Sequence, residues 1–184
     1  MTPLSSSPDL RLRSAPEPRP DDQEGAARFR DLMAAWPTGV SVVTSAASGQ
    51  PVGCTVTALA SVSVDPPLLL VSLAVGGRTL DAVRRHGRFG VCVLSTQRRD
   101  LGRAFATGDP VERFATADYG WVAGVPVLRD AATAVACVLT RQIPVADHVL
   151  VIGRPLWQAR DLTARPAIWF DRAYWDLCRP PGST

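Results

Sequence analysis

The sequence GCTVTALASVSVDPP, residues 53–67, is the stretch on which the interpretation of the whole chain depends. In an extended strand, alternate side chains lie on the same face. One face of this stretch would carry four hydroxyls and a leucine: Thr55, Thr57, Leu59, Ser61 and Ser63. The other face would be apolar, which is typical of a strand packed on a core: Val56, Ala58, Ala60, Val62 and Val64. The sequence therefore predicts a strand with one polar face and one buried face.

The hydroxyl face has two interpretations. Hydroxyl groups are neutral, and they both donate and accept hydrogen bonds. Such a row suits a flat heteroaromatic ligand that carries carbonyls, ring nitrogens and a phosphate better than it suits a metal ion. The same residues are also typical of a half-buried strand in which threonine is used for its β propensity. The stretch alone leaves both interpretations open, so the rest of the chain decides between them.

Length and composition predict a single globular domain. Of the 184 residues, 46% are hydrophobic and 20% are charged, as in ordinary globular proteins. The net charge of +3 is too small to indicate nucleic-acid binding, and all 20 basic residues are arginines because the chain has no lysine. Residues 1–24 hold five prolines and no periodic apolar pattern, which predicts a disordered tail before a domain at residues 25–184.

Cysteine usage and hydropathy predict a cytoplasmic protein without a metal centre. The four cysteines, at positions 54, 92, 137 and 178, form no C-x-x-C motif, and the chain has two histidines, which argues against a zinc cluster. Cys54, Cys92 and Cys137 lie among apolar or small residues, as buried free thiols do. The N-terminus lacks the apolar segment of a secretory signal. The longest apolar run, around residues 68–71, is too short to span a bilayer, so no membrane association is expected.

Periodicity and turn residues divide the chain into short elements. A helix is expected from residues 21–24 to Pro37, with an apolar stripe of Phe29, Leu32, Met33 and Trp36. A hairpin follows, with arms at residues 40–44 and 51–65, and then a fully buried strand at residues 68–73. Further strands are expected at residues 89–94, 126–128, 132–141, 147–152 and 166–170, short helices at 80–85 and 97–107, and a turn or helix at 172–177. Many short strands with few helices indicate a β-barrel.

Three further segments are candidates for a functional site. A helix is expected to follow the turn Gly76-Gly77-Arg78-Thr79, and the free amides at its N-terminus can bind a phosphate. The alternative is that the turn has no ligand and Thr79 simply caps the helix. His148 follows Asp147 at a strand edge and is either a structural hydrogen-bonding residue or a catalytic one. Residues 108–124 form a connector long enough to be a lid or a subunit contact. The sequence has no G-x-S-x-G nucleophile motif and no carboxylate pair suited to glycoside chemistry.

Seven short segments, taken in order and spacing, resemble the flavin reductase family with the FMN-binding split-barrel fold. They are PTGVSVVT at residues 37–44, the stretch at 53–67, LLLVSL at 68–73, RFGVCVL at 88–94, GVPVL at 124–128, DHVLVIG at 147–153 and PAIWF at 166–170. The resemblance covers roughly residues 27–178. It implies a mainly β split barrel of Greek-key type with a few short flanking helices, assembled as a homodimer with flavin bound in a groove near the subunit interface.

The resemblance also implies which residues bind the two ligands. The family's flavin contacts match Thr55, Val56, Thr57, Ala58, Leu59, Ser61, Val62, Ser72, Gly77, Arg78 and Thr79, with Ser61 toward the phosphate. The NADH side matches Trp36, Thr38, His148 and Tyr174, and His148 is the implied catalytic residue. The sequence departs from the family pattern at three positions: Ala146 for a usual Gly, Gly77 for a frequent Ser and Cys92 for a common Asn.

The implied chemistry is hydride transfer from nicotinamide C4 of NADH to N5 of FAD or FMN. This requires two rings stacked with the reacting atoms about 3–3.5 Å apart and needs no protein nucleophile. The family consists of small reductase components, so the reduced flavin would leave for a partner flavin-dependent monooxygenase. Two alternatives remain: a split-barrel flavoprotein whose tightly held flavin oxidises a small substrate, and a non-catalytic flavin-binding module. The sequence leaves FAD or FMN open, and also NADH or NADPH; the resemblance favours NADH, and no extra basic cluster marks a 2′-phosphate site.

Overall fold

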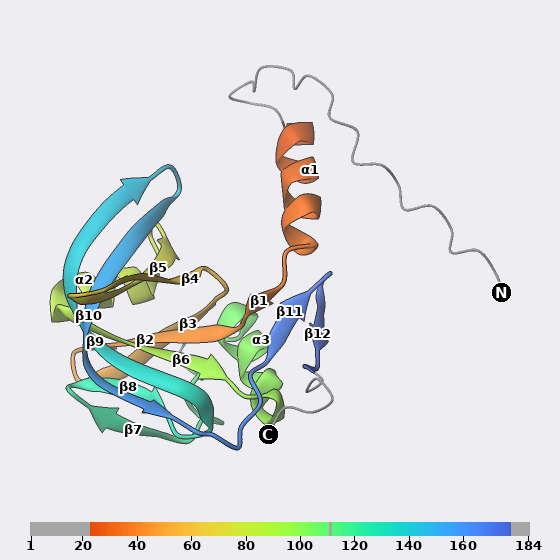
Figure 1. Ribbon diagram of the computed structural model, residues 1–184. Helices are drawn as coiled ribbons and strands as arrows, with labels where there is room; N and C mark the ends of the chain where they lie inside the picture. The colour runs from red at the N-terminus through yellow and green to blue at the C-terminus, as the bar shows by residue number, and fades with distance from the viewer. Residues whose placement is uncertain (1–22, 111, 178–184) are drawn as a thin grey trace.

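The computed structural model describes residues 23–110 and 112–177 (Figure 1). The predicted tail at residues 1–24 lies outside the described residues except for its last two, which already belong to helix α1 (Gln23–Ala34). The predicted helix is therefore confirmed, and Pro37 follows its end. No helix in the described ranges combines the length and the hydropathy that a membrane crossing requires.

A seven-stranded antiparallel sheet forms the body of the protein, in the order β3-β2-β6-β9-β10-β5-β4. The strands are β2 (Ser41–Ala47), β3 (Gln50–Val56), β4 (Leu59–Val64), β5 (Pro67–Ala74), β6 (Arg88–Leu94), β9 (Ala131–Val145) and β10 (His148–Arg160). The sheet is curled, but its two edge strands, β3 and β4, do not pair with each other (Figure 1). The predicted mainly β fold is confirmed, and the unpaired edges are where the barrel is split.

The stretch at residues 53–67 is not one strand, so the predicted continuous arm at 51–65 is wrong. β3 ends at Val56, the chain bends at Thr57 and Ala58, and β4 begins at Leu59. The Leu59 amide donates to the Thr57 carbonyl at 3.1 Å, and the Ser72 amide donates to the Ala58 carbonyl at 3.2 Å. The bend therefore carries the chain from one edge of the sheet to the other.

The predicted core face of this stretch is also wrong beyond Val56. Val56 is buried, but Ala58 and Ala60 are exposed, and Val62 and Val64 are exposed by 49% and 87%. The alternation does predict a strand, but β4 is an edge strand, and no residue of 23–110 or 112–177 buries Val62 and Val64 on its apolar side. Similarly, residues 68–73 are buried only at Val71 and Leu73, and the rest are half-buried.

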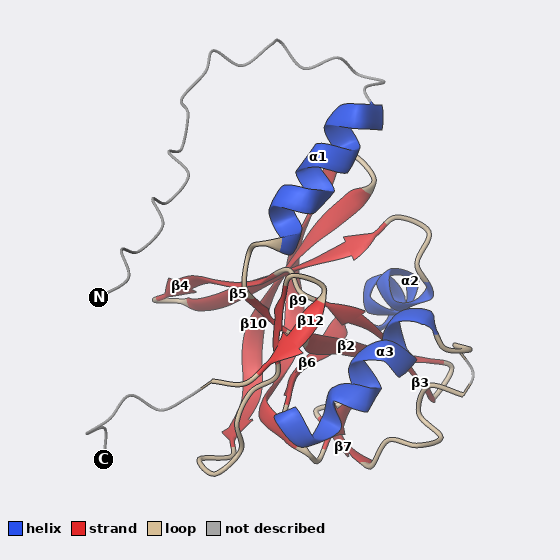
Figure 2. Cartoon of the chain, turned by 90° about the vertical axis from the view of Figure 1, so that its right-hand side faces the viewer, coloured by secondary structure: helices blue, strands red, loops and turns tan. Residues whose placement is uncertain are grey.

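Two hydrophobic clusters hold the sheet from its opposite faces. Val42 and Val43, adjacent on β2, belong to different clusters, as the alternation of a strand requires. Helix α2 (Arg78–His86) packs Leu80 and Val83 into one cluster, and helix α3 (Arg99–Thr107) packs Leu101 and Phe105 into the other. Both helices contact β2 and β3, each from its own side of the sheet (Figure 2). The two helices confirm the predicted helical segments at residues 80–85 and 97–107. A 3-10 turn at Thr96–Arg98 precedes α3.

Two smaller sheets complete the chain. β7 (Tyr119–Val122) and β8 (Val125–Leu128) form a hairpin, so the predicted connector at 108–124 contains a strand. β1 (Thr38–Gly39), β11 (Ile168–Phe170) and β12 (Ala173–Trp175) form a three-stranded sheet. The prediction of a turn or helix at 172–177 is wrong, because residues 173–175 return along β11 as a strand.

Helix α1 projects away from the sheet (Figure 1), and none of its residues is buried. The exposed fractions of its apolar stripe, including Trp36 just after the helix, are Phe29 61%, Leu32 66%, Met33 42% and Trp36 63%. The Asp171 amide donates to the Ala34 carbonyl at 2.7 Å, which ties the C-terminal end of the helix to the turn between β11 and β12. The helix is anchored at one end and presents its apolar stripe outward.

Candidate functional site

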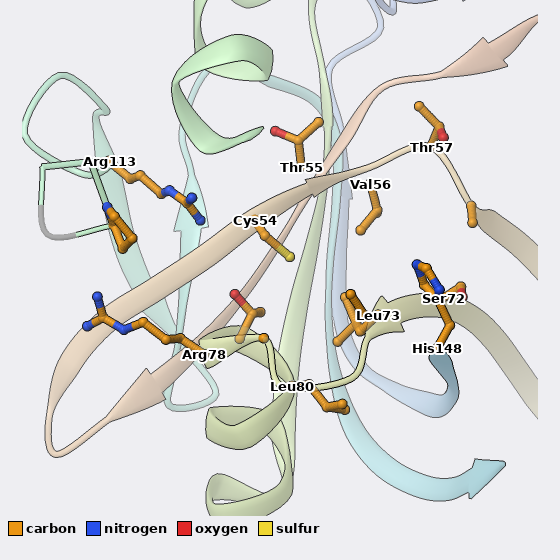
Figure 3. Close-up of a pocket in the computed structure, with 15 residues that line it drawn as sticks. Cys54, Thr55, Val56, Thr57, Ser72, Leu73, Arg78, Leu80, Arg113 and His148 are labelled. Atoms are coloured by element: carbon orange, nitrogen blue, oxygen red, sulfur yellow. The ribbon is translucent and has the colours of Figure 1, made fainter. Parts of the chain in front are cut away.

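A cavity of about 440 Å³ lies at the split of the sheet (Figure 3). Its walls come from the end of β3, the bend, the end of β5, the start of α2, the first residue of β10 and the connector after α3. Nine of the predicted site residues line it: Thr55, Val56, Thr57, Ala58, Ser72, Gly77, Arg78, Thr79 and His148. The two edges of the sheet thus leave room for a ligand that is the size of a small cofactor.

The β3 wall presents backbone as well as side chains. The Gly53 carbonyl accepts a hydrogen bond from Arg113 Nη1 at 2.9 Å, so it points away from β2. Backbone groups of alternate residues share a direction in an antiparallel strand, which places the N–H and C=O of Thr55 on the same open edge. The Thr55 hydroxyl is already used, since it donates to the Gly102 carbonyl of α3 at 2.7 Å. The contribution of Thr55 to a ligand is therefore its backbone.

The opposite wall holds His148 and Ser72. His148 pairs with Ala74 across β10 and β5, and Ala74 and Ser72 share a face of β5, so the two polar side chains are neighbours (Figure 3). The ring nitrogen Nδ1 of His148 lies 2.9 Å from Asp147 Oδ1, and its side chain is 45% exposed. The hydrogen bond from His148 lowers the pKa of the Asp147 carboxyl. A carboxylate only accepts, so Nδ1 carries the proton and Nε2 is left for a ligand.

The N-terminus of α2 forms a third wall. Gly77 is the N-cap, and no side chain caps the helix, so the interpretation of Thr79 as a capping residue is wrong. The first intrahelical hydrogen bond runs from the Asp81 amide to the Gly77 carbonyl at 3.1 Å. The Gly77 amide donates to the Ala74 carbonyl at 3.2 Å, so the free donors of this helix N-terminus are the amides of residues 78–80, where the helix dipole favours an anion. Thr79 is 4% exposed and faces the cavity from the second helical position.

Sequence reasoning missed six cavity residues: Cys54, Leu73, Ala74, Leu80, Pro110 and Arg113. Three of them adjoin predicted residues along the chain, and Ala74 lies two residues from Ser72. Pro110 and Arg113 come from the connector after α3, about 30 residues beyond the nearest predicted contact in α2, so no local pattern marks them. Only the folded chain brings Arg113 to Gly53.

The three described thiols are buried to different degrees. Cys92 and Cys137 are fully buried, and burial raises the pKa of each thiol to about 12. Cys54 is half-buried in the cavity wall, and burial raises its pKa, while the Thr79 hydroxyl and the charge of Arg113 act in the opposite direction. The expectation of free, buried thiols is confirmed for Cys92 and Cys137, whereas Cys54 is accessible from the cavity.

Six predicted site residues lie outside this cavity. Leu59, Ser61 and Val62 are on β4, beyond the bend, so the placement of Ser61 near a phosphate is not supported by this chain alone. Thr38 and Tyr174 are in the three-stranded sheet instead, each paired with Trp169, and Trp36 lies two residues before β1. The Tyr174 hydroxyl donates to the Arg99 carbonyl at 3.1 Å, and a Cβ at Gly102 would lie 2.1 Å from that hydroxyl oxygen. Tyr174 therefore packs on α3, the helix that accepts the Thr55 hydrogen bond.

Comparison with known proteins finds similar sequences and similar structures. The NADH-dependent FMN reductase AsuE2 of Streptomyces nodosus subsp. asukaensis is 43% identical over 136 residues, which are 72% of this chain and 74% of that protein. The structure of the NADH:FAD oxidoreductase SgcE6 of Streptomyces globisporus C-1027, in complex with NAD and FAD fragments, has a TM-score of 0.81 at 25% identity, covering 88% of this chain and 98% of that one.

A third similar protein is BorF, the flavin reductase component of a bacterial two-component tryptophan halogenase. Its structure has a TM-score of 0.75 at 26% identity and covers 84% of this chain and 99% of that one. The family model described as "Flavin reductase like domain" matches residues 33–177, which include every strand described above. The chain therefore belongs to the flavin reductase family.

Proposed function

We propose that this protein is an NADH-dependent flavin reductase, an oxidoreductase that reduces FAD or FMN and releases the reduced flavin. The observation that carries the proposal is the cavity at the split, which places neutral donors between two arginines and a histidine (Figure 3). The similarity to an NADH-dependent FMN reductase and an NADH:FAD oxidoreductase supports both ligands.

The donors of the cavity suit a flavin. An isoalloxazine ring offers carbonyl oxygens and ring nitrogens, which pair with N–H and O–H groups. The hydroxyls of Thr57 and Ser72 have no hydrogen-bond partner within the part of the chain that the structure describes, and both line the cavity. Together with the Thr55 backbone they are available for the ring, while the amides at the start of α2 are available for a phosphate.

His148 is the residue we assign to the nicotinamide. Bound NADH and flavin supply the hydride chemistry themselves, so the protein has to bind and orient them. Asp147 holds the Nδ1–H of His148, and this leaves Nε2 as an acceptor for a donor such as a carboxamide N–H. Asp147 is then a positioning residue, and His148 contacts the substrate.

The product of the reaction is reduced flavin, and we propose that it diffuses to a flavin-dependent monooxygenase in the cytoplasm. The similarity to a reductase component of a two-component system supports such a partner. The cavity fits this role because it is built from the open edge of a sheet and binds by hydrogen bonds and charge, so binding can be reversible.

A steady-state assay tests the proposal. NADH and NADPH are each combined with FAD, FMN and riboflavin, and absorbance is followed at 340 nm. We expect flavin-dependent oxidation of NADH, with NADPH used less well. Absence of flavin-dependent oxidation with any pair contradicts the proposal. A protein that purifies with flavin bound and releases none after reduction would be the tightly bound oxidase instead.

We further propose that the protein is a homodimer, since two apolar surfaces of one copy are uncovered. They are the stripe of α1 and the outer side of β4, which carries Val62 and Val64. Exposed apolar surfaces of this kind mark interaction sites. A second copy is the partner we infer because β4 continues directly from the cavity wall, as expected for flavin bound near a subunit interface.

The dimer is tested by light scattering after gel filtration. Leu32→Glu puts a charge in the middle of the α1 stripe, and Arg30→Glu is the control on the same helix. We expect a dimer for the unmodified chain and for Arg30→Glu, and dissociation at micromolar concentration for Leu32→Glu. A monomeric unmodified chain contradicts the proposal.

A further inference from the structure

Helix α3 is attached at two points to β3, the strand that forms one wall of the cavity. The Thr55 hydroxyl donates to the Gly102 carbonyl at 2.7 Å. Gly53 is on the same face of β3, and a Cβ at that position would lie 3.1 Å from the Phe105 ring of α3. Within the described ranges β3 pairs with β2 alone. Because no strand supports the open edge, the packing of α3 helps to hold this wall in place.

Tyr174 on β12 contacts the same turn of α3 from the other side. Its hydroxyl donates to the Arg99 carbonyl at 3.1 Å. Arg99 and Gly102 are three residues apart, so they are neighbours on the helix surface. A Cβ at Gly102 would lie 2.1 Å from the Tyr174 hydroxyl oxygen. The first turn of α3 therefore lies between Tyr174 and Thr55, as the order of β3, α3 and β12 in Figure 1 shows.

The ring of Tyr174 is itself fixed by its neighbours. The Trp169 ring packs against it edge to face, with the ring centroids 5.0 Å apart. The guanidinium carbon of Arg99 lies 5.8 Å from the centroid of the Tyr174 ring, and Arg99 forms an ion pair with Asp176. Burial raises the pKa of the Tyr174 hydroxyl, so this group stays protonated and donates at neutral pH. Tyr174 is thus a fixed support for the first turn of α3.

We infer that Tyr174 is a positioning residue for the flavin, which acts through Gly102 and Thr55 to hold β3 where the isoalloxazine ring requires it. The inference rests on the proposed function and adds to it two residues outside the cavity, Tyr174 and Gly102. It differs from the family pattern, which assigns Tyr174 to the NADH side. In this structure the contacts of Tyr174 lead to a residue of the cavity wall, Thr55.

The inference predicts which part of the flavin is affected. Thr55 offers its backbone N–H and C=O to the ring, and hydrogen bonds weaken when their distances and angles change. A displaced β3 should therefore weaken the contacts to the ring and leave those to the phosphate unchanged. FMN and riboflavin have the same ring and differ in the phosphate. Loss of the support from Tyr174 should weaken the binding of both flavins by the same factor.

Fluorescence titration with FMN and with riboflavin, both without NADH, tests the inference. We expect Thr55→Val to raise both Kd values about threefold to tenfold, and Tyr174→Phe to raise both about twofold to fivefold. Thr55→Ser keeps the hydroxyl and should stay within about twofold of the unmodified chain. Two controls should leave both Kd values unchanged. Thr140→Val loses a hydroxyl bond of the same kind, to the Ile152 carbonyl at 2.9 Å outside the cavity, and Tyr119→Phe is the same change at the other tyrosine.

The double variant Thr55→Val/Tyr174→Phe shows whether the two residues act through one path. Residues that belong to one network have non-additive effects, so Tyr174→Phe should raise the Kd for FMN by less than about 1.5-fold once the Thr55 hydroxyl is gone. Effects that simply multiply would mean that Tyr174 does not act through Thr55 and would overturn the inference.

Three further outcomes also contradict the inference. One is a rise in KM for NADH in Tyr174→Phe with an unchanged Kd for FMN, which would show a direct contact of Tyr174 with NADH. The second is an unchanged Kd for both flavins in Tyr174→Phe. The third is equal weakening by Thr55→Val and Thr55→Ser, and this pair decides if Tyr174→Phe fails to fold. The flavin affinities are measured without turnover, so they are separate from the NADH oxidation assay that decides the proposed function.

Discussion

The two halves of the opening stretch have nearly the same composition and opposite environments. Residues 53–58 are small, hydroxyl-bearing or apolar; residues 54–58 line the cavity, and Thr55 is hydrogen-bonded to α3. β4, from Leu59 to Val64, has the same kinds of residue and lies exposed at the other edge of the sheet. The bend at Thr57 and Ala58 separates them. The comparison teaches that hydroxyls along a strand do not make a binding wall; the wall depends on which edge of the sheet the strand occupies.

The largest expected effect is that of Gly53→Val, in the first half. A Cβ there would lie 3.0 Å from the Val43 carbonyl oxygen and 3.1 Å from the Phe105 ring. Overpacking of this kind costs about 2–3 kcal/mol. Urea denaturation should show that loss, whereas Ser61→Val in β4 should change stability by less than about 0.5 kcal/mol. Equal losses would mean that both halves are packed alike.

Ala58→Phe and Ala60→Phe form the next pair. Ala58 lines the cavity and Ala60, two residues on, does not. A phenyl ring at position 58 would occupy part of the 440 Å³ and should raise the Kd for FMN roughly tenfold, equivalent to about 1.4 kcal/mol. Ala60→Phe should change this Kd less than twofold. Fluorescence titration decides, and a stronger effect at position 60 would place the flavin on β4.

Removal of single hydroxyls compares the contributions of the two halves to FMN binding. Thr57→Val deletes a cavity hydroxyl, which should raise the Kd for FMN about threefold to tenfold, since a neutral hydrogen bond is worth about 0.5–1.5 kcal/mol net. Ser61→Ala should have a smaller effect. His148→Gln is the control, because it should raise KM for NADH and leave the Kd for flavin unchanged. A larger effect at Ser61 than at Thr57 would restore the family-based assignment.

The smallest expected effect is at the turn that delivers His148 to the wall facing the first half. Ala146 has a φ of +50°, in the left-handed region that favours glycine. Ala146→Gly relieves about 1–2 kcal/mol of strain and loses part of it to unfolded-state entropy, for a net gain of about 0.5 kcal/mol. Thermal unfolding measures the gain, and an unchanged KM for NADH would show that the turn conformation is already the one His148 needs.

Local patterns predicted most of the fold. The helix before Pro37, the hairpin of β2 and β3, and the strands that became β6, β9, β10 and β11 follow from periodicity and turn residues. The bend at Thr57 and Ala58 could not be predicted, because neither glycine nor proline marks it. It is fixed by pairing with β5, through the Ser72 amide. Tertiary pairing overrode an unbroken strand pattern here.

The site was predicted only in part, because some of its residues are placed by tertiary structure and not by a local pattern. Residues next to the bend and at the start of α2 were found from the family pattern, and the structure brings nine of them together with His148 included. Arg113 was missed because its place depends on the path of a connector with no periodic signal. Leu59, Ser61 and Val62 were included because the family pattern places flavin contacts there, whereas the bend carries them onto β4, away from this cavity.

The open edge of β3 also determines how its amides exchange with solvent deuterium. The Thr55 amide points to the same side as the Gly53 carbonyl, away from β2, while its neighbours on β3 are hydrogen-bonded into the sheet. In the ligand-free protein this amide exchanges without opening of the sheet, and a bound flavin protects it. Exchange in the peptide that covers residues 53–58 thus counts occupied cavities even when no hydride has moved.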